Sequence, residues 1–181
     1  MTFVRDRNCP GSTDGTDRLW LTMIRNYLIA TGVMQLVWEI VQLPLYTLWQ
    51  TDTAVQIAFA VFHCTAGDMA IGTAALAFAL AIAGSPDWPA RHFGPVLGCL
   101  IVFGMAYTIY SEHLNVTVRH VWAYSALMPV LPGLGTGLSP LAQWIVVPTA
   151  ALLWARRCAA KIEVGQGTQD IVRHCHSPDG K

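Results

Sequence analysis

Four ionisable side chains lie inside long apolar stretches of this 181-residue sequence: Glu39, His63, Asp68 and Glu112. Carboxyl and imidazole groups can exchange protons with a substrate. Ionisable side chains are costly among apolar residues, so they usually face the interior of a helical bundle and often mark function. We therefore predict Glu39, His63 and Glu112 as candidate acid/base residues.

Glu39 belongs to a polar stripe whose members follow each other by four, four, three and four positions: Thr31, Gln35, Glu39, Gln42 and Tyr46. This spacing places all five side chains on one face of a helix. The stripe predicts a lined pocket, and the alternative is a set of hydrogen bonds that hold neighbouring helices together. Residues expected to line the pocket are Gln35, Gln42 and Tyr46, joined from other stretches by Asp68, Thr108 and Gln143.

Small residues near Asp68 predict where helices approach each other. Ala60, Cys64 and Gly67 share one face, and small side chains allow close helix contact. His63 and Asp68 border this face on opposite edges, roughly 140° apart at 100° per residue. We therefore expect both to face the bundle interior without contacting each other.

The same residues are weak candidates for metal ligands. His63, Cys64 and Asp68 have suitable chemistry, but their spacing lacks the pair of histidines one turn apart that is typical of a zinc helix. The sequence therefore predicts no metal site, and it leaves the cofactor unknown.

The elements that carry these residues are transmembrane helices. Hydrophobic residues make up 54% of the chain and charged residues only 12%, about half the charged share of a soluble domain. A bilayer crossing needs roughly 20 apolar residues. Four stretches meet or approach this length, and they predict an all-α, polytopic membrane bundle forming a single domain: 23–47, 54–83, 93–112 and 140–154.

A charge-free run between the third and fourth spans is interrupted by Pro and Gly residues from Pro129 to Pro140. The part at 121–131 is too short to cross a membrane, and it carries Trp122 and Tyr124, residue types that favour membrane interfaces. We predict a short interfacial or re-entrant segment there.

The distribution of basic residues predicts the orientation. With four spans, ten Lys and Arg residues fall on the side of the two termini and only Arg119 on the other. Cytoplasmic loops carry the excess of Lys and Arg. We therefore predict a multi-pass protein of the inner (cell) membrane with a flexible cytoplasmic tail at 1–19 and a polar, disordered cytoplasmic tail at 160–181.

Equal numbers of acidic and basic residues, 11 of each, argue against nucleic acid as a partner. Three functions stay open, and the sequence does not decide whether the protein is an enzyme. The first is binding or processing of a lipid-like substrate in a polar pocket in the outer half of the bundle. The second is proton-coupled transport by a homo-oligomer, and the third is a non-catalytic subunit or assembly factor of a membrane complex. Membrane lipids are expected partners in each case.

Overall fold

The computed structural model describes residues 12–175, and the side chains of residues 19–161. Four long helices dominate it: α1 (Ser12–Gln42), α3 (Ala54–Ala83), α4 (Phe93–Glu112) and α5 (Leu138–Cys175). Three short elements connect them: the 3-10 helix η1 (Leu43–Leu45), α2 (Leu48–Thr51) and the π-helix η2 (His113–Val118). Among the described residues, four stretches are long and apolar enough to span a membrane: Leu19–Leu45, Ala54–Ala83, Phe93–Val118 and Leu138–Lys161. The predicted four-span helical bundle is confirmed.

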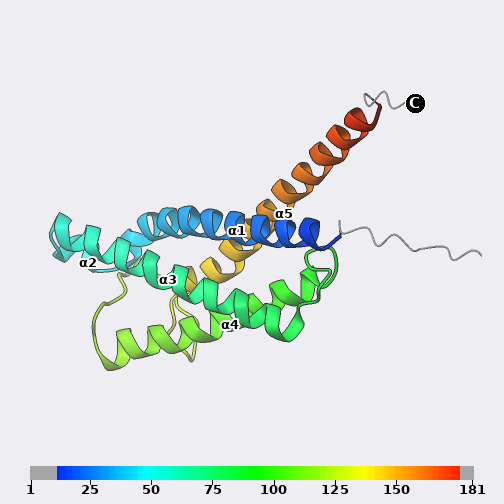
Figure 1. Cartoon of the computed structure of the whole chain (residues 1–181). Coiled ribbons are helices and arrows are strands. Elements are labelled where there is room, and N and C mark those ends of the chain that lie inside the picture. Colours follow the sequence, from blue (N-terminus) through cyan, green and yellow to red (C-terminus); the bar gives the residue numbers. More distant parts are fainter. Residues whose placement is uncertain (1–11, 176–181) are drawn as a thin grey trace, which may run out of the picture.

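The four long helices form a ring in which α1 and α4 each pack against α3 and α5 (Figure 1). Thus α3 and α5 lie opposite each other. We call the end of the bundle that carries residues 119–137 the loop end. The opposite end, where residues 84–92 join α3 to α4, is the tail end.

Local sequence explains where the helices stop and start at the loop end. Pro44 lies within η1, and a proline disfavours the helical conformation of the residue before it, so α1 ends at Gln42. Thr53 begins α3 with a capping box: its side chain accepts from the Gln56 backbone N–H, and the Gln56 side chain accepts from the Thr53 backbone N–H. These two signals fix the short connection between α1 and α3.

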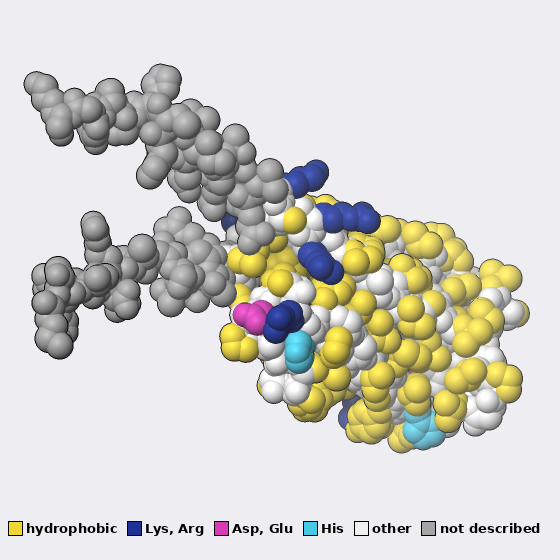
Figure 2. Space-filling model, turned by 90° about the vertical axis from the view of Figure 1, so that its right-hand side faces the viewer, with side chains coloured by type: hydrophobic (Ala, Val, Ile, Leu, Met, Phe, Trp, Pro, Cys, Tyr) yellow, Lys and Arg dark blue, Asp and Glu magenta, His cyan; other side chains and the backbone are white. Residues whose placement is uncertain are grey.

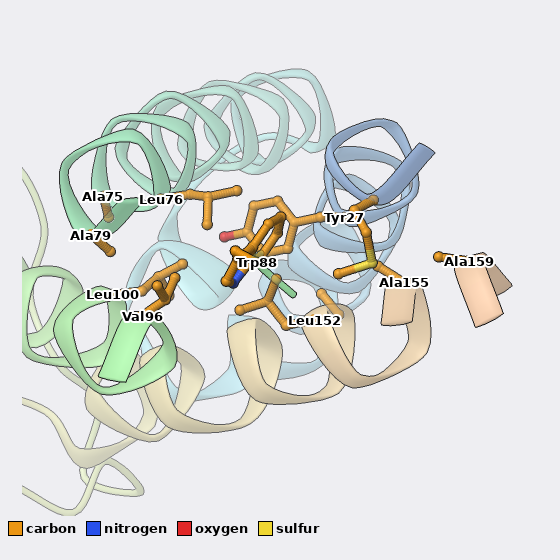
Figure 3. Close-up of a cluster of buried hydrophobic side chains, with 12 residues drawn as sticks. Tyr27, Ala75, Leu76, Ala79, Trp88, Val96, Leu100, Leu152, Ala155 and Ala159 are labelled. Atoms are coloured by element: carbon orange, nitrogen blue, oxygen red, sulfur yellow. The ribbon is translucent and has the colours of Figure 1, made fainter. Parts of the chain in front are cut away.

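The tail half of the bundle has an apolar core. Figure 3 shows Tyr27 from α1, Leu76 from α3, Leu100 from α4 and Leu152 from α5 pointing toward one another around Trp88. All five are at most 4% exposed. Trp88 comes from the connection between α3 and α4, so a loop residue closes this end of the core.

A close contact between α4 and α5 lies nearer the loop end. The side chain of Trp144 packs directly on Gly104, and a Cβ atom at position 104 would lie 2.1 Å from Trp144 Cε3. Only glycine leaves room for the indole ring at this distance. Trp144 is 2% exposed, so the contact fixes the position of α5 beside α4.

The first and last helices, α1 and α5, extend beyond the apolar stretches from which the spans were predicted. α1 begins at Ser12, within the segment expected as a flexible tail, and residues 1–11 lie outside the described part of the chain. α5 continues through residues 160–175, which were expected to be disordered, whereas residues 176–181 are not described. Charged and long polar residues such as Arg, Lys, Glu and Gln favour helices as well as Leu does, so a helix can continue where its apolar span ends.

The connection from α4 to α5 is an irregular loop at the loop end. Residues 121–131 contain no helix, and two isolated antiparallel bridges order the connection, Tyr46 with Tyr124 and Val130 with Gly137. The interfacial or re-entrant position of this segment stays a prediction.

The outer surface is mostly hydrophobic on the face shown in Figure 2, where Lys and Arg side chains gather mainly toward one end. Large apolar side chains are exposed on α3, including Val55 at 79% and Phe59 at 70%. Exposed apolar side chains over this length are those expected to contact lipid.

Candidate functional site

A buried polar network joins α1, α3 and α5 in the loop half of the bundle. Its centre is Gln143 on α5, which is 2% exposed. The Nε2 atom of Gln143 donates to Gln35 Oε1 at 2.6 Å, to Asp68 Oδ2 at 2.8 Å and to Glu39 Oε1 at 3.2 Å. One amide group therefore connects three helices.

Two further hydrogen bonds extend the network toward the loop end. Gln42 Nε2 donates to Glu39 Oε1 at 2.8 Å, and Ser139 Oγ donates to Gln42 Oε1 at 2.9 Å. Gln42 is 6% exposed. The carboxyl group of Glu39 is thus held from both α1 and α5.

Glu39 Oε1 and Asp68 Oδ2 lie near each other, because both accept from the same Gln143 Nε2 atom. Two ionised carboxylates this close repel each other, which favours a proton on one of the two groups. Two adjacent carboxyl groups that share one proton form an acid and a base within one site.

A second polar group lies between α4 and the loop. The Tyr124 hydroxyl donates to Glu112 Oε2 and accepts from the Gly137 backbone N–H at 2.9 Å. The Tyr46 ring packs against the Tyr124 ring with their centroids 5.6 Å apart. Burial, and after it the hydrogen bond to Glu112, raises the pKa of the Tyr124 hydroxyl well above its usual range, so this group stays protonated and keeps its role as a donor.

Backbone hydrogen bonds fix the loop across the end of α1. Thr47 N–H donates to Ala123 O at 2.9 Å, and Ser125 N–H donates to Leu45 O at 2.9 Å. Ser125 Oγ adds a bond to Pro44 O at 2.9 Å. The loop therefore covers the polar network at the loop end, while the apolar core closes it at the tail end.

The side of α3 is less completely covered. Asp68 and Cys64, one turn apart, are only partly buried, and Gly67 is exposed with no atom within 4 Å of its Cβ position. The network thus comes close to the surface along α3, on the side of the protein that faces lipid.

The structure brings together most of the residues singled out from the sequence. Gln35, Glu39, Gln42 and Gln143 are all at most 9% exposed, and each is joined to the network by a hydrogen bond, as is Asp68. Thr108 and Glu112 are buried on one face of α4, and Tyr46 is buried beside Tyr124. Thr31 is buried one turn before Gln35.

His63 does not join them. Its side chain is exposed on α3 and stacks on the Phe59 ring, with centroids 5.6 Å apart and an interplanar angle of 15°. Phe59 lies one turn earlier on the outward face of α3, and the step of about 100° per residue carries His63 away from Asp68. The expectation that His63 faces the interior is therefore incorrect, and its side chain lies outside this network.

Two residues of the site did not emerge from the sequence as site residues. Tyr124 was predicted to lie at the membrane interface, and Ser139 was not among the predicted pocket residues. Tyr124 reaches Glu112 through a loop fold that helical periodicity cannot indicate. Ser139 gave a usable signal, because it lies four residues before Gln143 on the same face of α5.

Within the described residues, no group of three or more His, Cys, Asp and Glu side chains is arranged to hold a metal ion. Comparison with protein-family models, curated proteins and solved structures found no match for the chain. The fold itself defines the class: an all-helical membrane protein with four spanning helices.

Proposed function

We propose that this protein binds a lipid-like substrate in the polar network of the loop half, where Glu39 and Asp68 exchange a proton with it. The observation that carries the proposal is the closeness of these two carboxyl groups, which come from α1 and α3 and both accept from Gln143 Nε2 on α5. A purely structural network is best served by neutral amides and hydroxyls, because burying a carboxyl group costs more.

The route to the network supports a substrate that is dissolved in the membrane. The loop and the apolar core cover the two ends, whereas Asp68 and Cys64 are partly exposed along α3. A substrate that reaches Asp68 from this side has to travel through lipid. Its polar headgroup then contacts the carboxyl groups while its apolar tail stays beside α3.

The position of the polar residues favours this proposal over proton-coupled transport. A transport path needs polar groups across the full thickness of the membrane. Here the tail half is filled by residues such as Leu76, Leu100, Trp88 and Leu152, and the buried carboxyl groups are confined to the loop half. Polar groups confined to one half of the bundle favour a binding site in that half over a path across the membrane.

We further infer that the protein lies in the inner membrane with both termini in the cytoplasm. The support is the excess of ten Lys and Arg residues on the side of the termini over one on the other side. The loop end and its polar network then lie in the outer half of the membrane.

Native mass spectrometry of the purified protein tests the proposal. The wild type should retain a lipid-like molecule of defined mass, and Glu39→Gln and Asp68→Asn should lose it. Asp87→Asn is the matched control, because Asp87 is an exposed carboxylate at the tail end, 4.0 Å from the exposed Arg91 and away from the polar network. Equal retention by all four proteins contradicts the proposal.

A further inference from the structure

We infer that the headgroup recognised by this site is an uncharged hydroxyl, so that the substrate class is a lipid alcohol. This inference rests on the proposed function and adds to it the chemistry of the ligand. Three properties of the network support it: its charge, its acceptors and one unpaired donor.

The charge of the network excludes an anionic headgroup. Glu39 and Asp68 both accept from the same Gln143 Nε2 atom, and the buried Glu112 lies in the same half of the bundle. The sequence has no Lys or Arg from residue 26 to residue 90, and only Arg91 and Arg119 from there to residue 155. Arg91 lies at the tail end and Arg119 is exposed. A phosphate or carboxylate headgroup would be repelled without any compensating cation.

The acceptors of the network require a headgroup that donates a hydrogen bond. Glu39 Oε1 and Asp68 Oδ2 share the two protons of Gln143 Nε2 with Gln35 Oε1, so the carboxyl oxygens have more acceptor capacity than the network fills. An ether or ester oxygen cannot supply the missing proton, whereas a hydroxyl or an ammonium group can.

The unpaired donor of the network distinguishes a hydroxyl headgroup from an ammonium headgroup. Gln35 is 0% exposed, and its Nε2 atom has no hydrogen-bond partner among the described residues, although Oε1 of the same amide accepts from Gln143. The free N–H groups therefore lie inside the network, where an unpaired donor is costly. A hydroxyl oxygen can accept from Gln35 while its proton goes to a carboxylate. An ammonium group donates only, so it leaves Gln35 unpaired.

Photolabelling with four amphiphiles tests the inference. The probes are hexadecanol, hexadecylamine, hexadecyl methyl ether and hexadecyl phosphate, each with a diazirine in the chain. The full chain is placed in phosphatidylcholine nanodiscs, whose lipid has no hydroxyl group. The alcohol should label the peptides that carry Gln35 and Asp68 saturably, and half-saturation should need roughly tenfold less alcohol than amine, ether or phosphate, as expected when one buried partner is left unpaired.

Variants at Gln35 separate recognition from folding. In Gln35→Leu the preference for alcohol over amine should disappear, while the preference for alcohol over ether remains. Gln35→Glu keeps the side-chain size and has acceptors only, so its preference should shift to the amine. Gln50→Leu, which removes an exposed amide in α2, is the control and should behave as the wild type.

The outcomes distinguish the inference from the proposed function. Equal saturable labelling of the same peptides by all four probes overturns the hydroxyl preference and leaves a lipid site at the network. A stronger preference for the amine in the wild type also overturns it. Absence of saturable labelling at these peptides by every probe overturns both.

Discussion

Gln143 on α5 donates a hydrogen bond of 2.8 Å to Asp68 on α3, although these two helices lie on opposite sides of the four-helix ring. The bond passes through the centre of the bundle, where Gln143 also reaches Gln35 and Glu39 on α1. Gln143 is therefore the one side chain that connects the polar groups of three helices. Its removal takes away the donor to Gln35 Oε1 and to Asp68 Oδ2, whereas Glu39 keeps its hydrogen bond from Gln42.

Gln143→Leu should lower the stability of the protein by about 1–3 kcal/mol, the cost of leaving buried polar groups unpaired. Thermal unfolding of the purified variant measures the effect. Gln50→Leu removes an exposed amide and should change stability by less than about 0.5 kcal/mol. If both variants unfold like the wild type, Gln143 does not hold the network together.

Gly104→Ala should also destabilise the bundle, for a steric reason. The added Cβ would lie 2.1 Å from the Trp144 ring, so α4 and α5 have to move apart. Overpacking of this kind costs roughly 1–3 kcal/mol. Gly98→Ala is the matched control on the same helix, because no atom lies within 4 Å of the Cβ position at Gly98. Equal melting temperatures for the two variants would show that Trp144 does not pack against Gly104.

Tyr124→Phe should loosen the loop at residues 119–137. The change removes the hydroxyl that donates to Glu112 and accepts from Gly137, while the ring contact with Tyr46 can remain. Faster hydrogen exchange in this loop, with unchanged exchange in the tail half of the bundle, is the expected result. Unchanged exchange in the loop would mean that its backbone bonds to Thr47 and Leu45 suffice to fix it.

The same hydroxyl makes the loop sensitive to high pH. Burial raises the pKa of Tyr124 above that of a tyrosine in the unfolded chain, so the native state holds this proton more tightly. The contribution of Tyr124 to stability is therefore complete below about pH 10 and is lost as the pH rises further. Limited proteolysis by subtilisin should cut the wild-type loop increasingly above that pH. Tyr124→Phe should show a smaller rise, and an equal rise in both proteins would assign the effect to other groups.

Fusion reporters test the proposed orientation. Reporters at residues 1, 89 and 181 should be cytoplasmic, and those at residues 51 and 118 should lie outside, because Lys and Arg concentrate on the side of the termini. A reporter at residue 181 that lies outside would mean that the chain crosses the membrane an odd number of times.

Helical periodicity was sufficient to predict the polar stripe of α1. Thr31, Gln35, Glu39 and Gln42 are all at most 9% exposed on one side of α1, whereas Tyr46 is buried beyond the end of this helix, in extended backbone after η1. The four spans followed from long apolar stretches with very few charges, because few sequences other than membrane helices are so poor in charged residues over such lengths. Both signals are local to one helix.

The contacts between helices could not be predicted in the same way. The face of small residues formed by Ala60, Cys64 and Gly67 predicted where α3 comes closest to its neighbouring helices. In the structure Gly67 is exposed, and the buried small residues of α3 are Gly72, Ala75 and Ala79. Tyr27 and Trp144 lie near the Cβ position of Gly72, so large partner side chains decide which turn of α3 is buried. On α4, Gly94 and Gly98 are exposed, whereas Gly104 packs against the Trp144 ring of α5.

An experimental structure of the wild type in lipid nanodiscs tests the central claim most directly. The claim is that Glu39 and Asp68 form the centre of a site for a lipid-like molecule that enters along α3. Density for such a molecule should lie beside Gln35, Glu39 and Asp68, with its apolar tail between Cys64 and the surrounding lipid. A well-ordered structure in which protein side chains alone fill this space, with the α3 side closed over Asp68, would contradict the account.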